Sequence, residues 1–204
     1  MRSGSGVGWL ACCVCPMTMT TKKNRRKNLK TEYLLNREVD LVLAMLTRRN
    51  ALIMRTALHT GLRIGDVLSI KTDSLSARFW VTESKTKKRR QVGLPEPLLS
   101  DIKNQAGAVW AFENPRTGKP QTRQAVWKDV KRAARALRLP QNVAPHSARK
   151  VFAVELLSKY GDIARVKRAL NHSSEAITLI YALADRQLES KQKRRRARAG
   201  RQRV

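Results

Sequence analysis

The stretch "PHSARKVFAVELLSKYG" at residues 145–161 shows how this chain folds. Its apolar side chains recur every four residues, which is the spacing of one face of an α-helix. This stripe consists of Ala148, Phe152, Leu156 and Tyr160. Gly161 follows directly, and glycine is favoured where a helix ends in a left-handed residue. The pattern predicts one long helix with a single buried stripe.

The segments on either side are mostly helical in pattern as well. Further helices are predicted at 36–46, 50–60, 64–70, 95–107, 122–139 and 162–170. Asn36 and Thr122 suit the capping position at a helix start, and Gly61 suits a helix end. The exception is "RFWVTESKTKKRRQVGLP" (78–95), where two β-forming runs flank a basic turn and predict a hairpin. The expected fold is therefore mainly α with one small β-hairpin.

The charge of the chain indicates its partner. Among 204 residues, 43 are Lys or Arg and 15 are Asp or Glu, for a formal net charge of +28. Segments 22–30 and 191–203 are basic and contain no acid, but the residues between them also carry an excess of basic side chains. A folded basic surface of this kind predicts binding to a polyanion, most simply a nucleic acid.

The cysteines of the amino-terminal segment indicate neither a disulfide framework nor a zinc site. Its three cysteines, Cys12, Cys13 and Cys15, are too close together to close useful loops and lack a familiar zinc spacing. No apolar run approaches the ~20 residues of a membrane helix. We therefore expect a soluble protein from a compartment that is not oxidising, with no membrane partner. The length of 204 residues and the hydrophobic content of 42% predict one domain with one core.

Several polar residues occupy positions where the predicted elements could bring them together. His146 and Arg149 are three residues apart at a helix start and share a face. Arg63 follows a glycine turn, Asp66 lies one helical turn later, and Lys85 is in the hairpin turn. Each of these, taken alone, is typical of an ordinary surface residue.

The stretch "NHSSEAITLIYAL" (171–183) contains a histidine and a tyrosine nine residues apart. On one continuous helix, His172 and Tyr181 would point to opposite sides. Ser173 and Ser174 are good helix caps, so a break there would let the two side chains converge. The alternative is that His172 is a capping or core histidine and Tyr181 a core aromatic.

The order Arg, hairpin Lys, His-x-x-Arg, His and Tyr resembles the catalytic domain of the tyrosine recombinases, the phage integrase family. The likeness covers residues 33–183, and the short chain most resembles the compact fimbrial-type inversion recombinases. Three positions depart from the usual family pattern, which has leucine, histidine and glycine at them, in that order. They are Ala148, Lys150 and Asn171.

The resemblance implies a DNA breaking-rejoining enzyme fold and a role for each residue. Arg63 and Arg149 would bind the scissile phosphate, and Tyr181 would attack it to form a 3′-phosphotyrosyl link. Lys85 would be the general acid, with Lys87 and Lys88 as the alternatives in the same turn. His146 would assist proton transfer, and His172 would bind a non-bridging oxygen. Asp66 would brace an arginine or a histidine. Further DNA contacts are expected from Lys87, Lys88, Arg89, Arg90 and Lys150.

By the same resemblance, we expect a site-specific recombinase for integration, excision or inversion of a mobile DNA element. It would act on double-stranded DNA in the bacterial cytoplasm as a dimer to tetramer, without metal or cofactor, with or without an accessory DNA-bending protein. The expected organisation is a disordered or misassigned leader with a basic segment at 1–30, a catalytic domain at 31–185 and a basic tail at 186–204. The alternatives are type IB topoisomerase-like relaxation of DNA and a non-catalytic DNA- or RNA-binding protein.

Overall fold

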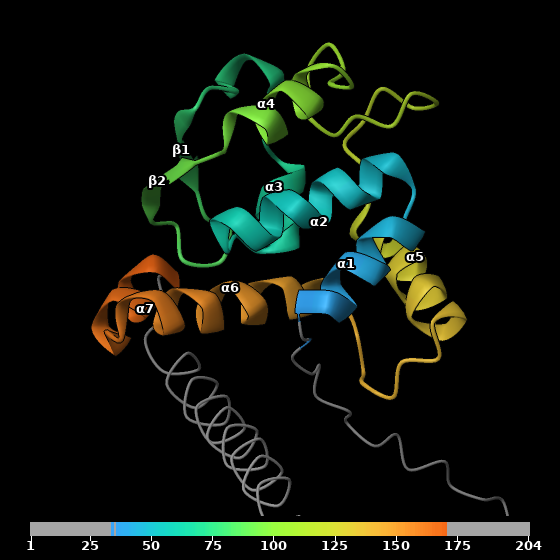
Figure 1. Cartoon of the computed structure of the whole chain (residues 1–204). Coiled ribbons are helices and arrows are strands. Elements are labelled where there is room, and N and C mark those ends of the chain that lie inside the picture. Colours follow the sequence, from blue (N-terminus) through green and yellow to red (C-terminus); the bar gives the residue numbers. More distant parts are fainter. Residues whose placement is uncertain (1–33, 35, 171–204) are drawn as a thin grey trace, which may run out of the picture.

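Helix α2 (Arg48–Thr60) is the centre of the fold (Figure 1). The structure is a computed structural model that describes Leu34 and residues 36–170. Helices α1, α3, α4 and α6 all contact α2, and strand β2 touches it as well. Apolar side chains such as Ile53 and Ala57 are buried there. Two buried hydroxyls, those of Thr56 and Thr60, donate to carbonyls one turn earlier in the same helix, so α2 enters the core without losing hydrogen bonds.

The described elements follow the predicted order. They are α1 (Asn36–Met45), α2, α3 (Ile64–Leu68), a 3-10 turn (Thr72–Ser74), β1 (Arg78–Thr82), β2 (Arg89–Gly93), α4 (Glu96–Lys103), α5 (Arg123–Ala136), α6 (Pro145–Tyr160) and α7 (Ile163–Leu170). The prediction of a mainly α fold with one small hairpin is confirmed, and only the 3-10 turn was not expected.

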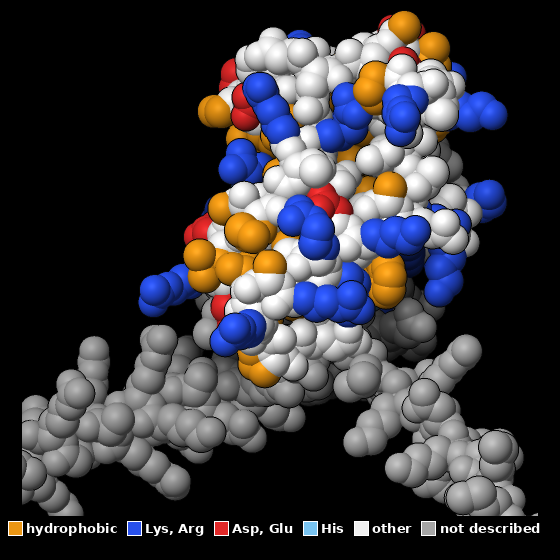
Figure 2. Space-filling model, turned by 90° about the vertical axis from the view of Figure 1, so that its right-hand side faces the viewer, with side chains coloured by type: hydrophobic (Ala, Val, Ile, Leu, Met, Phe, Trp, Pro, Cys, Tyr) orange, Lys and Arg blue, Asp and Glu red, His pale blue; other side chains and the backbone are white. Residues whose placement is uncertain are grey.

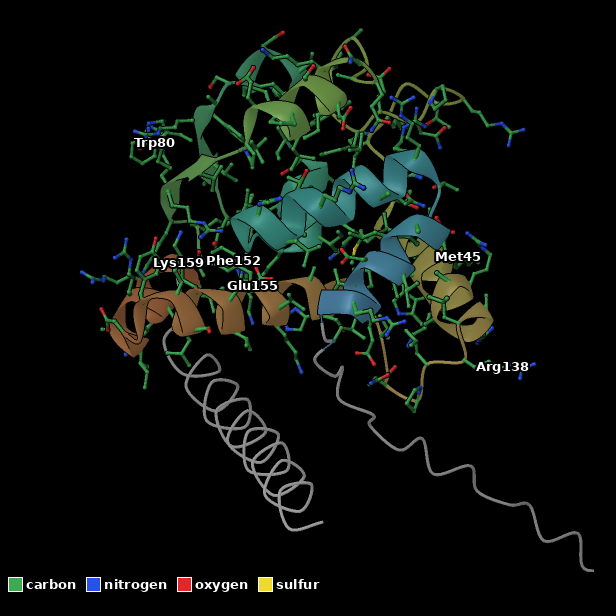
Figure 3. All side chains as sticks on the ribbon, in the orientation of Figure 1. Met45, Trp80, Arg138, Phe152, Glu155 and Lys159 are labelled. Atoms are coloured by element: carbon green, nitrogen blue, oxygen red, sulfur yellow. The ribbon has the colours of Figure 1, made fainter. Side chains whose placement is uncertain are left out.

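The predicted end of α2 at Gly61 is also confirmed. Gly61 has a φ of +63°, and its N–H donates to the carbonyl of Ala57 at 2.9 Å. A Cβ added at Gly61 would lie 2.3 Å from the Phe152 ring, so only glycine fits here. Figure 3 shows Phe152 on the side of α6 that faces α2. Gly61 thus ends α2 and also allows α6 to approach it closely.

The hairpin is antiparallel, with Trp80 paired with Gln91. Phe79 and Val81 on β1 point into the core, while Arg78, Trp80 and Thr82 are exposed. This alternation is that of a strand with one face covered. Within the turn, the N–H of Lys87 donates to the carbonyl of Glu83 at 2.8 Å, and Lys87 adopts a φ of +56°. The basic turn therefore has a defined backbone conformation.

The buried stripe predicted for α6 is wrong at its end. Ala148 is buried and Phe152 and Leu156 are half-buried, but Tyr160 is 41% exposed. Among the described residues, the first half of α6 belongs to the main core, whereas Ala153, Leu156 and Leu157 form a small separate cluster with Val166 and Leu170 of α7. The ring of Tyr160 is covered on one face by the guanidinium of Arg165, at 3.7 Å from the ring centre.

Helix α5 begins as predicted, because the Thr122 hydroxyl accepts from the N–H of Ala125 at 3.1 Å. Asp129, in the middle of α5, accepts from the backbone N–H and the hydroxyl of Thr47, both at 3.0 Å, and from Asn50 at 2.7 Å. These bonds tie α5 to the first turn of α2. Both helices also contact α6.

No helix in the described part of the chain is long and apolar enough to cross a membrane. The predicted leader (1–30) and basic tail (186–204) lie outside the described residues, so the predicted domain boundaries stay predictions.

Candidate active site

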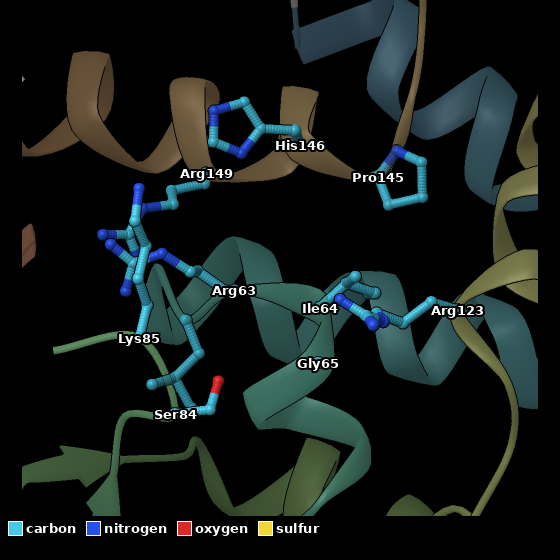
Figure 4. Close-up of a pocket in the computed structure, with 10 residues that line it drawn as sticks. Arg63, Ile64, Gly65, Ser84, Lys85, Arg123, Pro145, His146 and Arg149 are labelled. Carbon is cyan, nitrogen blue, oxygen red and sulfur yellow. The ribbon is translucent and has the colours of Figure 1, made fainter. Parts of the chain in front are cut away.

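Four of the predicted catalytic residues line one open cavity of about 360 Å³. The cavity is lined by Leu62, Arg63, Ile64, Gly65, Ser84, Lys85, Arg123, Pro145, His146 and Arg149. These residues come from the turn before α3, the hairpin turn and the starts of α5 and α6. Figure 4 shows the side chains of Arg63, Lys85 and Arg149 converging, with His146 beside them on α6.

Arg63 reaches the cavity from the sharp turn between α2 and α3. It is the residue just before α3 and has extended backbone angles. Its Nη1 donates to Oε2 of Glu83 at 2.6 Å, and the arginine side chain is 18% exposed. A short, charge-assisted bond of this kind holds the orientation of the guanidinium plane.

Arg149 is buried in the first turns of α6. Its Nη1 donates to the carbonyl of Gly61 and its Nη2 to the carbonyl of Leu170, both at 2.6 Å. Burial, reinforced by repulsion from the nearby Arg63, lowers the pKa of Arg149 to about 10. Arg149 is still cationic at neutral pH, and it connects the carboxyl ends of α2 and α7 at the wall of the cavity.

The hairpin turn holds Lys85 between two tethered neighbours. The N–H and hydroxyl of Ser84 donate to Oδ1 of Asp66, at 2.9 and 2.6 Å. The hydroxyl of Thr86 donates to Oε2 of Glu83 at 3.1 Å. The exposed Lys85 side chain lines the cavity, whereas Lys87 and Lys88 are not among the lining residues.

Asp66 has a different partner from the one predicted. We expected it to brace an arginine or a histidine, but its hydrogen bonds go to Ser84. The carboxylate is 1% exposed, and its negative charge acts on Arg90 and Arg149 through space. Asp66 therefore positions the start of the lysine turn.

Arg90, which we predicted to contact DNA, faces the protein. Its Nη2 donates to the carbonyl of Thr60 at 2.7 Å, its Nη1 to the carbonyl of Ala169, and its Nε lies 3.4 Å from Oε1 of Glu83. Burial lowers the pKa of Arg90, although Glu83 opposes that shift. These internal partners favour a positioning role next to Arg149.

The remaining predicted DNA contacts are at the surface or near it. Lys87, Lys88 and Arg89 are exposed, and Lys150 is half-buried. The guanidinium of Arg89 lies 5.3 Å from the centre of the Trp80 ring on the outer face of the hairpin. On the face shown in Figure 2, Lys and Arg side chains are spread widely and acidic ones are few.

Two residues of this site escaped sequence analysis. Glu83 is fully buried beside Arg63 and Arg90, and Arg123 lines the cavity at the start of α5. One signal for Glu83 was available. It follows Phe79 and Val81 at alternate positions, so the strand pattern places an acid where the inward face expects an apolar side chain.

His172 and Tyr181 lie outside the described residues, so their convergence on this cavity stays a prediction. Among the described residues, no three His, Cys, Asp or Glu side chains lie close enough together to hold a metal ion.

The chain is similar in sequence to known proteins. The family described as "Phage integrase family" matches residues 32–187. A Bacillus subtilis protein named "Probable integrase/recombinase YoeC" is 31% identical over 156 residues, which cover 74% of this chain and 81% of that one. Tyrosine recombinase XerD of Mycobacterium tuberculosis is 28% identical over 152 residues, covering 68% of this chain and 49% of XerD.

A solved structure of an integrase has a similar fold. A λ integrase dimer bound to a core site superposes with a TM-score of 0.60 at 21% identity, over 72% of this chain and 58% of that one. The chain thus spans most of YoeC but about half of XerD. The sequence match over residues 32–187 and the common fold agree, and the chain belongs to the phage integrase family, that of the tyrosine recombinases.

Proposed function

We propose that this chain is the catalytic domain of a site-specific recombinase, which cleaves and rejoins double-stranded DNA through a 3′-phosphotyrosyl link. One observation carries the proposal. The cavity brings Arg63, Lys85, His146 and Arg149 together from three separate segments, and these are the side chains that phosphodiester cleavage by a tyrosine would need.

Arg63 and Arg149 are suited to bind the scissile phosphate. The transition state of phosphoryl transfer concentrates negative charge on the non-bridging oxygens, and fixed cations stabilise that charge. Both guanidiniums are held by protein oxygens, Arg63 by Glu83 and Arg149 by two backbone carbonyls. Because they are already oriented, little reorganisation is required when the phosphate enters.

Lys85 is the best candidate for the general acid. When the bond from phosphorus to the 5′ oxygen breaks, its electron pair passes to that oxygen, which needs a proton to leave readily. Lys85 lines the cavity, and the residues on both sides of it are tethered. Lys87 and Lys88 follow in the same turn but do not line the cavity, which favours Lys85.

Tyr181 is the proposed nucleophile, with its phenolic proton leaving toward His146 at the cavity wall. Leu170, whose carbonyl accepts from Arg149, is two residues before His172. This short link supports a role for His172 at the same phosphate.

The wider assembly follows from the charge of the chain. We assign non-specific contacts with DNA phosphates to the exposed basic side chains of the hairpin turn and to the basic segments 22–30 and 191–203. We also propose that the chain acts as a dimer to tetramer on DNA, in the cytoplasm, as a catalytic domain at 31–185. The λ integrase relative forms a dimer on a core site, which supports this assignment.

Covalent capture tests the proposal without knowledge of the target site. The full chain is incubated with a library of nicked duplexes of random sequence, and complexes that survive denaturation are isolated and their DNA sequenced. A nick next to the cleaved bond releases the short product strand and traps the phosphotyrosyl link. We expect the parent to select a defined sequence and Tyr181→Phe to capture none. Failure of the parent to capture any duplex, or capture by Tyr181→Phe, would refute the proposal.

A further inference from the structure

We propose that Glu83 is a positioning residue for DNA cleavage, and that its buried carboxylate sets Arg63 and the Lys85 turn in register with each other. The inference rests on the proposed function and deepens it. It assigns to one side chain the task of bringing the phosphate-binding arginine and the general acid to the same phosphate.

The contacts of Glu83 connect both parts of the site. Oε2 accepts from Nη1 of Arg63 at 2.6 Å and from the hydroxyl of Thr86 at 3.1 Å. Arg63 precedes α3, and Thr86 directly follows Lys85 in the hairpin turn. One carboxylate oxygen therefore joins two segments whose side chains line the cavity.

The second oxygen of Glu83 extends the link. Oε1 lies 3.4 Å from Nε of Arg90, whose two terminal nitrogens donate to the ends of α2 and α7. Arg149 donates to the carbonyls of Gly61 and Leu170, which directly follow the residues that Arg90 binds. Glu83 is thus connected through Arg90 to the same helix ends that Arg149 holds.

The burial of Glu83 argues against an incidental surface ion pair. The side chain is 0% exposed, and a buried carboxylate is costly unless its partners compensate for the loss of water. An apolar residue at this inward position of the hairpin would avoid that cost, as Phe79 and Val81 do. An acid in place of an apolar side chain is the kind of local exception that marks a functional site.

Charge gives a second reason for a carboxylate. Arg63, Arg90 and Arg149 repel one another: the pKa of Arg149 is lowered first by burial and then by Arg63 and Arg90, whereas Glu83 raises it. Without the charge of Glu83, Asp66 alone among the described acids would offset the charge at Arg90 and Arg149, and the three guanidiniums would move apart. A shift of about 1 Å in a catalytic group can cost about 10²-fold in rate.

Two substitutions at Glu83 distinguish the effect of its charge from the effect of its shape. Glu83→Gln keeps the shape and removes the charge, and Glu83→Asp keeps the charge on a shorter side chain. Asp129→Asn is the matched control, since Asp129 also joins two elements through several hydrogen bonds, but its partners Thr47 and Asn50 do not line the cavity, whereas Arg63, the partner of Glu83, does. Each full-length variant is tested on a duplex selected by the parent, for affinity, thermal unfolding and rate of covalent capture.

We expect Glu83→Gln to bind the duplex within about twofold of the parent and to form the covalent link about 10²-fold more slowly. Glu83→Asp should recover part of that rate. Asp129→Asn should unfold at a lower temperature yet react at the parental rate while folded. A parental rate in Glu83→Gln would overturn the inference, and so would slowing fully explained by unfolding in both Glu83 variants.

A sulfur substitution tests the link to Lys85. If sulfur replaces the 5′ bridging oxygen, the leaving group departs as a thiolate, which is a far weaker base than an alkoxide and needs no proton. Glu83→Gln should regain part of its lost rate on this substrate, and Arg63→Lys should regain none. Equal slowing of Glu83→Gln on both substrates would overturn its connection to the general acid. Absence of any capture by the parent would instead refute the proposed function itself.

Discussion

Nη2 of Arg149 donates a 2.6 Å hydrogen bond to the carbonyl of Leu170, at the end of the described part of α7. The same guanidinium donates to the carbonyl of Gly61 at the end of α2. The carboxyl end of a helix carries partial negative charge, so a buried cation that binds carbonyls at two such ends stabilises both. Arg149 is therefore part of the structure as well as a candidate ligand of the phosphate.

This double role predicts different results for the two arginines. Arg63→Lys and Arg149→Lys keep the charge but lose the fork, so each should slow cleavage by at least about 10²-fold. Only Arg149→Lys should also lower the unfolding temperature clearly, because lysine cannot reach two carbonyls that arginine spans. Capture rates and thermal unfolding of both variants check this. Parental rates in both would mean that the arginines are not ligands of the phosphate.

Gly61→Ala should destabilise the protein and slow cleavage. The new Cβ would meet the Phe152 ring at 2.3 Å, and the alanine would have to adopt a φ of +63°. The carbonyl of residue 61, to which Arg149 donates, would then shift. Gly161→Ala is the matched control. Gly161 has a φ of +65°, and a Cβ added there meets no atom of the described residues within 4 Å, so the substitution should cost only the strain of about 1–2 kcal/mol. Denaturant unfolding compares the two, and equal losses would contradict a role for the contact with Phe152.

Among the three lysines of the turn, Lys85→Ala should slow capture most and Lys87→Ala and Lys88→Ala little. Lys85 lines the cavity and the others do not. Capture on an oxygen duplex and on a 5′ sulfur duplex measures the general-acid contribution directly, since only loss of the acid is rescued by sulfur. A sulfur-rescued defect in Lys87→Ala or Lys88→Ala, and not in Lys85→Ala, would reassign the role.

Asp129 should contribute to the pH dependence of stability. Burial alone would raise its pKa, but the bonds from Asn50, Thr47 and Arg132 outweigh burial and lower it. A carboxyl with a lowered folded-state pKa stabilises the fold above its unfolded pKa of about 3.9 and loses this contribution as pH falls further. Asp129→Asn should thus be less stable than the parent at pH 7, and the difference should shrink below about pH 4. A difference independent of pH would contradict this.

Deleting segments 22–30 and 191–203 should weaken binding to cognate and random duplexes alike. Both segments are basic and contain no acid, so they are suited to phosphates and not to base recognition. The slope of log affinity against log salt should flatten by about 0.9 for each DNA phosphate that the truncated protein no longer neutralises. An unchanged slope would mean that the remaining chain binds all of these phosphates by itself.

The elements of the fold were largely predictable from local sequence. The helix start at Thr122, the left-handed end of α2 at Gly61 and the basic hairpin turn each depend on a few neighbouring residues, and the structure confirms them. Backbone preferences and side-chain periodicity act over one or two turns, so they can be read along the chain. The positions of Arg63, Lys85, His146 and Arg149 on these elements were also evident, and the structure brings the four together.

What each charged group contacts was decided by the tertiary structure. Arg149 meets Gly61 from 88 residues away, and Arg63 meets Glu83 across 20 residues. The partner of Asp66, the inward turn of Arg90, the burial of Glu83 and the exposure of Tyr160 all depend on which segments pack together. The sequence by itself determined the elements and the order of the polar residues, because these depend on local backbone preferences. The pairing of buried charges depends on desolvation and on distances across the core, and only the folded chain sets those.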